Sequence, residues 1–291
     1  MSETLPAGTR PGVVTLIVPD LERSLEFYQR SLGMSVHQQK GNQVSLGARG
    51  GQDILVLIEE PNATQPPRHA TGLYHLAILL PSRLALAQAL LRLASSGWPV
   101  QGASDHLVSE AIYLADPDGN GIEVYHDRPR PQWSYRNGQV QMATLPLDVD
   151  GVLSEVQNEN GELVEQPAGL PASTVLGHVH LKVADIDHAE AFYTGVLGFQ
   201  LMARYGQSAA FVSAGGYHHH IGFNVWESAG ASPPPAGSAG LRDFTILLPD
   251  EAALGRVIDR VRSAGLSANK QDHGYLVHDP SQNGVLLRST P

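Results

Sequence analysis

The chain has 291 residues, of which 42% are hydrophobic and 16% charged, so it is long enough to form two ordinary domains with proper cores. Its 19 basic and 29 acidic side chains give a formal net charge of −10, which argues against nucleic acid or an anionic membrane surface as the main partner. It has no apolar run of about 18 residues that would span a membrane, and its lack of cysteine excludes disulfides, thiolate metal sites and a cysteine nucleophile.

A pattern of one strand, one helix and three short strands is predicted four times along the chain. In its first copy, apolar and polar side chains alternate up to Asp20, as in a strand with one buried face. Helical spacing then follows, with Asp20 as the expected N-cap and Gly33 as the expected stop. The copies of this strand and helix lie at residues 13–34, 75–98, 178–199 and 243–266.

The chain is therefore expected to have an α+β fold built from four βαβββ modules. One open sheet of this size cannot bury both of its faces, so the modules must pair, and two pairs give two open-barrel domains. Loops rich in Pro, Gly and Ser separate modules 1 and 2 and modules 3 and 4. The predicted boundaries are 11–65 for module 1, 72–130 for module 2, 131–172 for a linker, 173–228 for module 3 and 240–291 for module 4.

The register of the repeats indicates candidate metal ligands. Counting back seven positions from the end of each first strand gives Val13, His75, His178 and Asp243. Alignment of the last strands of modules 2 and 4 makes Glu123 equivalent to Leu286. Strand alternation places His75, His178 and Glu123 away from the helices. If modules 2 and 3 pair, these groups meet in one cavity as a metal site, and modules 1 and 4 form a metal-free half with Asp243 at the surface. If modules 1 and 2 pair and modules 3 and 4 pair, each cavity receives half a site.

Two imidazoles and one carboxylate with open coordination positions are the ligand set of non-haem Fe(II) oxygenases. The expected cofactor is Fe(II), and Mn(II) accepts the same nitrogen and oxygen ligands. One side chain of the run His218–His220 should enter the same cavity. If this run is a regular strand, His218 and His220 share one face and His219 lies on the other. At the end of module 2, we expect Asp127 and Arg128 to form an ion pair.

The four modules resemble the vicinal-oxygen-chelate superfamily over nearly the whole chain. Residues 106–123, HLVSEAIYLADPDGNGIE, are similar to the signature of extradiol ring-cleavage dioxygenases. The matching positions are His106, Tyr113, Asp116, Pro117, Gly119 and Glu123. Ser104 is a small departure from that pattern. The likeness is greatest to the two-domain bacterial catechol 2,3-dioxygenases, through the segments GLYHLAILLPSR, GHVHLKV and GGYHHHIGFNVW.

This resemblance implies His75 and His178 as the imidazole ligands and Glu123 as the carboxylate ligand. In better-known extradiol enzymes the metal site comes from the last two modules, but here Leu286 occupies the position of the glutamate. The metal site should therefore be built from modules 2 and 3.

The resemblance also implies residues that act on the substrate. His219 matches the acid–base histidine, whereas strand alternation favours His220, so both stay candidates. Tyr113 matches a tyrosine that hydrogen-bonds the metal-bound substrate oxygen, and His106 matches a second histidine beside the substrate.

The expected function is extradiol ring cleavage of a catechol-type aromatic with O2, in aromatic hydrocarbon catabolism. One alternative is a glyoxalase-type isomerase, with His220 as a fourth protein ligand and Ni or Zn as the metal. A second alternative is a non-catalytic small-molecule binding or resistance protein. We expect a cytoplasmic location because the first residues lack the features of a signal peptide, and relatives of this kind often form homo-oligomers.

Overall fold

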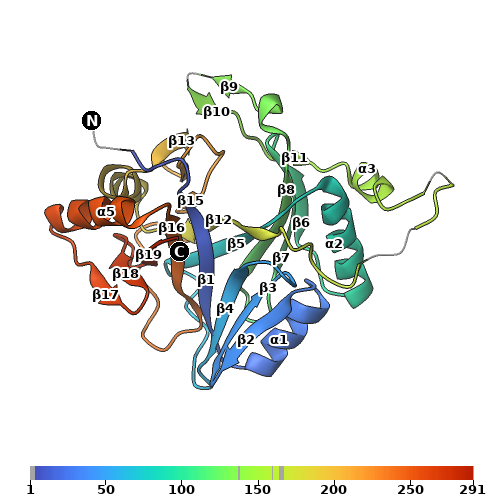
Figure 1. Cartoon of the computed structure of the whole chain (residues 1–291), viewed down its shortest axis with the longest axis horizontal. Helices are drawn as coiled ribbons and strands as arrows, with labels where there is room; N and C mark the ends of the chain where they lie inside the picture. The colour runs from blue at the N-terminus through green and yellow to red at the C-terminus, as the bar shows by residue number, and fades with distance from the viewer. Residues whose placement is uncertain (1–3, 137, 159, 164–166, 291) are drawn as a thin grey trace.

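The computed structural model describes residues 4–290 except 137, 159 and 164–166. Two large sheets run through the molecule, and helices α1, α2 and α5 lie around them (Figure 1). In each module the first strand pairs in parallel with the last strand of the same module, which requires the helical crossover between them. The predicted α+β fold of four βαβββ modules is confirmed.

The first sheet combines strands from the two ends of the chain, in the order β17-β18-β19-β16-β1-β4-β3-β2. Its halves meet where β1 and β16 pair antiparallel. The N-terminal half consists of β1 (Arg10–Val18), α1 (Leu21–Arg30), β2 (Ser35–Lys40), β3 (Gln43–Gly47) and β4 (Asp53–Glu59). The C-terminal half consists of β16 (Gly240–Leu248), α5 (Glu251–Ser263), β17 (Asn269–Gln271), β18 (Gly274–His278) and β19 (Gly284–Ser289).

The second sheet combines the two middle modules, in the order β11-β6-β7-β8-β5-β12-β15-β14-β13. Here β5 and β12 pair antiparallel at the centre. One half consists of β5 (Gly72–Leu80), α2 (Arg83–Ser96), β6 (Gly102–Asp105), β7 (Ser109–Ala115) and β8 (Gly121–Asp127). The other consists of β12 (Val175–Lys182), α4 (Ile186–Glu190), the π-helical segment η2 (Ala191–Leu197), β13 (Gln200–Tyr205), β14 (Ala209–Ser213) and β15 (Ile221–Asn224).

The segment between these two halves has structure of its own. It contains η1 (Arg130–Gln132), β9 (Tyr135–Arg136), β10 (Gln139–Val140), β11 (Leu145–Pro146) and α3 (Val149–Ser154). Strand β11 extends the second sheet by pairing with β6, while β9 and β10 form a separate hairpin. Helix α3 begins after Asp148, whose side chain accepts a hydrogen bond from the Gly151 backbone N–H. Strand β11 therefore joins this part of the linker to the second sheet.

The module helices begin with the same capping device, a side-chain oxygen that accepts a hydrogen bond from the backbone N–H three residues later. The capping residues are Asp20, Ser82, Asp185 and Asp250. Each one lies two or three residues beyond the end of the first strand of its module, so the chain turns onto the sheet at nearly the same point every time. The apolar sides of α1, α2 and α5 then pack against the strands and form the main core.

Two equivalent tyrosines tie neighbouring modules together. The Tyr28 hydroxyl, on α1, donates to Asp116 Oδ2 at 2.9 Å, and the Tyr193 hydroxyl, on η2, donates to Asp279 Oδ2 at 3.0 Å. Both aspartates begin the Asp-Pro turn that precedes the last strand of the next module. These buried hydrogen bonds connect module 1 to module 2 and module 3 to module 4.

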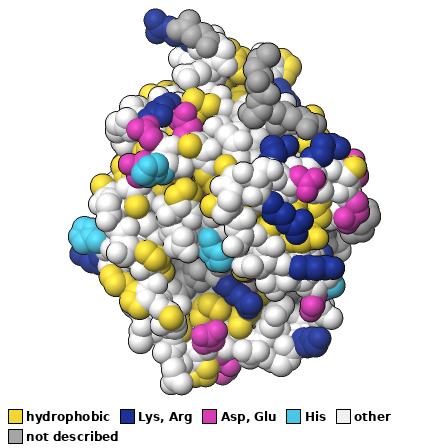
Figure 2. Space-filling view, turned by 90° about the vertical axis from the view of Figure 1, so that its left-hand side faces the viewer, with side chains coloured by type: hydrophobic (Ala, Val, Ile, Leu, Met, Phe, Trp, Pro, Cys, Tyr) yellow, Lys and Arg dark blue, Asp and Glu magenta, His cyan; other side chains and the backbone are white. Residues whose placement is uncertain are grey.

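None of the helices formed by the described residues is long and apolar enough to cross a membrane. On the face shown in Figure 2, basic and acidic side chains are interspersed among neutral and apolar ones. This face therefore lacks the continuous basic surface that nucleic acid or anionic lipid would require.

Candidate metal centre

Three buried side chains from adjacent strands of the second sheet meet at one point. His75 lies on β5, Glu123 on β8 and His178 on β12, with β5 between the other two strands. Glu123 Oε2 is 3.0 Å from His75 Nε2 and 3.1 Å from His178 Nε2. The two Nε2 atoms are 3.3 Å apart. The structure thus brings together the three predicted metal ligands.

Strand pairing explains why these side chains converge. Ala77 on β5 pairs with Glu123 on β8 and with His178 on β12, so the methyl group of Ala77 lies in the row between them. A β-bulge falls between Leu176 and His178 and sets the face on which His178 points. A Cβ atom on Gly177, within this bulge, would lie 1.9 Å from the hydroxyl oxygen of Tyr125, so glycine is required there.

Burial affects the protonation states of His178 and Glu123. Burial lowers the pKa of His178 to about 4. Burial alone would raise the pKa of Glu123, but the positive charge that His178 or His75 carries when protonated, together with the hydrogen bonds from both rings, holds that pKa well below its usual value. At pH 7 the site therefore presents an ionised carboxylate beside the neutral imidazole of His178, which are the protonation states that metal ligation needs.

The donor atoms fit a divalent metal. For bonds of about 2.1 Å, neighbouring ligands on an octahedral ion lie about 3.0 Å apart, and the three observed separations are close to this value. Two imidazole nitrogens and one carboxylate oxygen on one side of an ion form the facial arrangement used by non-haem Fe(II) oxygenases. The other side of such an ion would face the adjoining cavity.

The site opens into a cavity of about 1260 Å³. Its lining includes the three metal-ligand candidates and, near them, His106, Tyr113, His180 and His219. An aromatic wall continues outward, since Tyr74 contacts His180 and Trp226 with ring centroids 5.1 and 5.2 Å apart. The cavity is therefore large enough for an aromatic substrate, with flat rings along its wall.

His180 lines this cavity but was not among the predicted site residues. The signal was present, because strand alternation put it on the same face as His178. The Asn224 side-chain amide donates to His180 Nε2 at 2.9 Å, and its oxygen accepts from the Trp226 backbone N–H at 3.1 Å. Burial lowers the pKa of His180 well below its usual value. His180 is thus neutral, with its proton on Nδ1.

Tyr113 and His106 form a hydrogen-bonded pair at the cavity wall. His106 Nδ1 lies 2.7 Å from the Ala143 carbonyl oxygen, which only accepts, so this nitrogen carries the proton. In a neutral His106, Nε2 then accepts from the Tyr113 hydroxyl at 2.6 Å. Burial raises the pKa of Tyr113 well above its usual value, and the charge of Glu123 adds to this effect. The linker thus supplies the group that orients His106.

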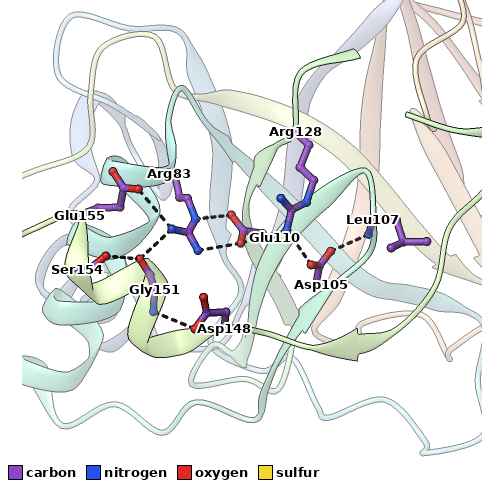
Figure 3. Close-up of polar contacts among 9 residues, drawn as sticks. All are labelled: Arg83, Asp105, Leu107, Glu110, Arg128, Asp148, Gly151, Ser154 and Glu155. Atoms are coloured by element: carbon purple, nitrogen blue, oxygen red, sulfur yellow. Dashed lines mark hydrogen bonds and ion pairs between the residues drawn. The ribbon is translucent and has the colours of Figure 1, made fainter. Parts of the chain in front are cut away.

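The turn that carries His106 is held by a network of charged residues (Figure 3). Arg128 binds Asp105 at 2.7 Å, and Asp105 accepts from the Leu107 backbone N–H at 2.8 Å. Leu107 has a φ of +68°, a strained conformation for a residue other than glycine. Arg128 also contacts Glu110 at 3.3 Å. The expected ion pair between Asp127 and Arg128 is wrong, because neighbouring residues at a strand end point to opposite sides.

The three consecutive histidines have different environments. His219 lines the cavity, and its ring centroid is 4.1 Å from that of His178. His218 Nε2 lies 2.8 Å from Asp127 Oδ1. His220 Nδ1 accepts from the Ala214 backbone N–H at 3.2 Å, and His220 is not among the residues that line the cavity. Regular alternation does not apply here because β15 begins only at Ile221, after the run.

The first sheet has different side chains at the positions equivalent to the metal-ligand candidates of the second sheet. Asp243 on β16 accepts a hydrogen bond from the Thr15 hydroxyl at 3.1 Å, and it is partly buried rather than at the surface as expected. Among the described residues, the group of three side chains that could hold a metal ion is His75, Glu123 and His178 in the second sheet.

The chain is similar to known proteins along most of its length. The model of the Glyoxalase/Bleomycin resistance protein/Dioxygenase superfamily matches residues 10–124 and 175–285. The Catechol-2,3-dioxygenase of Bacillus subtilis (strain 168) is 46% identical over 281 residues, which cover 96% of each chain. The Metapyrocatechase of Geobacillus stearothermophilus is 26% identical over 202 residues, which cover 65% of this chain and 50% of that one.

Solved structures show the same fold. A putative dioxygenase from Bacillus subtilis subsp. subtilis str. 168 has a TM-score of 0.67 at 12% identity, covering 100% of this chain and 87% of that one. Glyoxalase I from Zea mays has a TM-score of 0.58 at 15% identity, covering 96% and 92%. The family match spans most of the four modules, and the expected resemblance is confirmed: the chain belongs to the Glyoxalase/Bleomycin resistance protein/Dioxygenase superfamily.

Proposed function

We propose that the protein is an extradiol ring-cleaving dioxygenase that acts on a catechol-type aromatic with O2. The observation that carries this proposal is the buried group of His75, Glu123 and His178, whose donor atoms lie 3.0–3.3 Å apart beside the cavity. Support comes from the 46% identical relative named Catechol-2,3-dioxygenase, which aligns over 96% of both chains. Modules 2 and 3 would then form the metal half and modules 1 and 4 the metal-free half.

We propose Fe(II) as the ion held by these residues, with Mn(II) as the other ion that suits the ligands. When bound, the ion would act as a Lewis acid toward the diol and would pass electrons from the diol to O2. The protein's part is to hold both reactants in one place.

His219 is the proposed acid–base residue. It lines the cavity next to His178, and burial lowers its pKa well below the usual value for histidine. A neutral imidazole can accept the proton of a substrate hydroxyl and return it to the ring-opened product. His220 is held by Ser213 and the Ala214 backbone, which argues against this role for it.

Tyr113 and His106 are proposed to hold a substrate oxygen. With His106 neutral, the Tyr113 hydroxyl donates to His106 and its oxygen can accept from a substrate hydroxyl. Transfer of a substrate proton to the Tyr113 oxygen, as the Tyr113 proton passes to His106 Nε2, would leave the Tyr113 hydroxyl as a donor to the negatively charged substrate oxygen. The Tyr113–His106 pair can therefore hydrogen-bond the substrate oxygen both before and after the substrate loses a proton.

The isomerase alternative requires four protein ligands, and His220 was the candidate for the fourth. Its ring nitrogen Nδ1 accepts from the Ala214 backbone, and the described residues offer a group of three ligands at this site. The geometry therefore favours a centre with several open positions, as oxygen chemistry requires, over a four-ligand isomerase centre.

Oxygen consumption tests the proposal directly. Protein prepared without oxygen is loaded with Fe(II), Mn(II) or Zn(II), and each form is mixed with catechol and its 3- and 4-substituted derivatives in an oxygen-electrode cell. The expected result is one O2 consumed per diol and a yellow ring-fission product with the Fe(II) or Mn(II) form, whereas the Zn(II) form is inactive. No oxygen uptake with any metal and any diol would refute the proposal. Turnover of a glutathione hemithioacetal by the Zn(II) or Ni(II) form would support the isomerase instead.

A further inference from the structure

A hydrogen-bonded chain leads away from His219 to a carboxylate at the edge of the sheet. His219 Nδ1 lies 2.8 Å from His218 Nδ1, and His218 Nε2 lies 2.8 Å from Asp127 Oδ1. The other oxygen of Asp127 accepts from the Tyr217 hydroxyl at 2.8 Å, and Tyr217 in turn lies 2.8 Å from the Tyr125 hydroxyl. Both histidine side chains in this chain are buried. The proposed mechanism uses only His219.

The chemistry of these groups decides which atoms carry protons. An ionised carboxylate only accepts hydrogen bonds, so His218 Nε2 must carry a proton. In a neutral His218, Nδ1 is then bare and can only accept. With His218 in this neutral form, the 2.8 Å contact between the two Nδ1 atoms places a proton on His219 Nδ1. A neutral His219 with its proton on Nδ1 has a bare Nε2, which is the form that can accept a proton from a substrate.

We propose that Asp127 and His218 are positioning residues that hold His219 in the tautomer with a bare Nε2 and fix the orientation of its ring. The catalytic use of this tautomer rests on the proposed function. The tautomer itself is a property of the folded protein and can be measured without that function. Asp127 acts through His218 and touches neither the metal ligands nor the cavity. In this series of hydrogen bonds, Asp127 has the place of the aspartate in a Ser-His-Asp triad, where the carboxylate orients the histidine.

The tautomer is measurable without catalysis. Protein labelled with 15N at histidine and loaded with diamagnetic Zn(II) gives long-range 1H–15N spectra in which protonated and bare ring nitrogens have distinct shifts. The signals of His219 are assigned by their loss in His219→Gln. We expect a protonated Nδ1 and a bare Nε2 for His219 in the unaltered protein. A protonated Nε2 in that protein would overturn the inference, whatever the activity.

The variant Asp127→Asn replaces an obligate acceptor by an amide that can also donate to His218 Nε2. We expect a mixture of His219 tautomers and a fall in kcat of about 10- to 100-fold, with KM for the diol and iron content retained. Asp127→Glu, which keeps the carboxylate, should recover most of the rate. Tyr217→Phe removes the other hydrogen bond to Asp127 but leaves the acceptor in place, so it should keep the bare Nε2.

These results separate the two proposals. An unchanged His219 tautomer and an unchanged kcat in Asp127→Asn would show that His219 is oriented by its packing alone. The expected tautomer in a protein that consumes no oxygen with any diol would support the positioning chain and refute the dioxygenase. An equal loss of kcat in Tyr217→Phe, with loss of iron, would indicate a structural role and contradict the inference.

Discussion

The Nε2 atoms of His75 and His178 lie 3.3 Å apart although 103 positions separate the two residues in the chain. They come from different modules and meet because β5 and β12 pair antiparallel at the centre of one sheet. Glu123 completes the group from β8, on the other side of β5. The candidate metal centre therefore depends on the pairing of two modules.

Glu123→Gln should abolish tight metal binding. The substitution replaces the one carboxylate of the group by a neutral amide, and removal of a direct ligand should cost more than the about 10- to 100-fold that outer partners of a ligand contribute. Iron content after dialysis and titration calorimetry with Fe(II) under nitrogen measure the effect. Glu227→Gln is the matched control, since Glu227 lines the same cavity outside the ligand group. Full iron retention by Glu123→Gln would contradict the assignment.

His219→Gln and His220→Gln should differ although the two residues are neighbours. Loss of the acid–base residue is expected to lower kcat about 100-fold or more, with iron retained, because a positioned proton acceptor contributes that much. His220→Gln should keep most of the rate, since the His220 ring bonds Ser213 and the Ala214 backbone rather than lining the cavity. Steady-state kinetics with the best diol measure both. The reverse order of effects would assign the proton transfer to His220.

Much of this site could be predicted because it depends on repetition and strand alternation. The repeat register identified His75 and His178 at equivalent places, and period-two alternation put Glu123 on the same side of the sheet. These patterns depend on the backbone geometry of single modules, which local sequence determines. The same reasoning placed His180 on the correct face, but gave no reason to assign it a role.

The features of the site that could not be predicted depend on contacts between distant segments and on irregular backbone. The choice between His219 and His220 needed the knowledge that β15 begins at Ile221, so that the histidine run lies in an irregular bend before the strand, where alternation does not hold. The orientation of His106 depends on the Ala143 carbonyl group from the linker. A linker whose path is set by packing against the sheet has no periodic signal that would predict such a contact.

The stability of the protein should fall between pH 7 and pH 5 in part because of His220. Burial lowers the pKa of His220 to about 3 in the folded protein, against about 6.5 in an unfolded chain. Between these values the unfolded chain binds more protons, so this contribution is complete above pH 6.5 and is lost as the pH falls. The loss at pH 5 amounts to about 2 kcal/mol.

Urea unfolding of the metal-free protein at pH 7 and pH 5 measures this loss. The variant His220→Gln retains the other buried histidines but lacks this one, so the difference between the two proteins isolates its contribution. The unaltered protein should lose about 2 kcal/mol more than the variant between the two pH values. The same loss in both proteins would show that His220 keeps its ordinary pKa after folding.

Glu110→Gln should destabilise the protein far more than Glu155→Gln, although both carboxylates bind Arg83 (Figure 3). The Glu110 side chain is only 3% exposed, bonds Arg83 through both of its oxygens and also contacts Arg128. The substitution leaves the partly buried guanidinium groups of Arg83 and Arg128 without the negative charge that both contact. This change should lower the free energy of unfolding by about 3 kcal/mol. The Glu155 side chain is 39% exposed, and its removal should cost less than about 1 kcal/mol.

Urea unfolding at pH 7 compares these two variants, and kinetics add a second readout. Arg128 also binds Asp105, which holds the turn that carries His106, so Glu110→Gln should raise KM for the diol while Glu155→Gln leaves it unchanged. Equal stabilities for the two variants would mean that Arg83 and Arg128 find other partners or water when Glu110 is neutral. A destabilised Glu110→Gln with an unaltered KM would show that the Leu107 turn keeps its shape without the network and that the Ala143 carbonyl group alone orients His106.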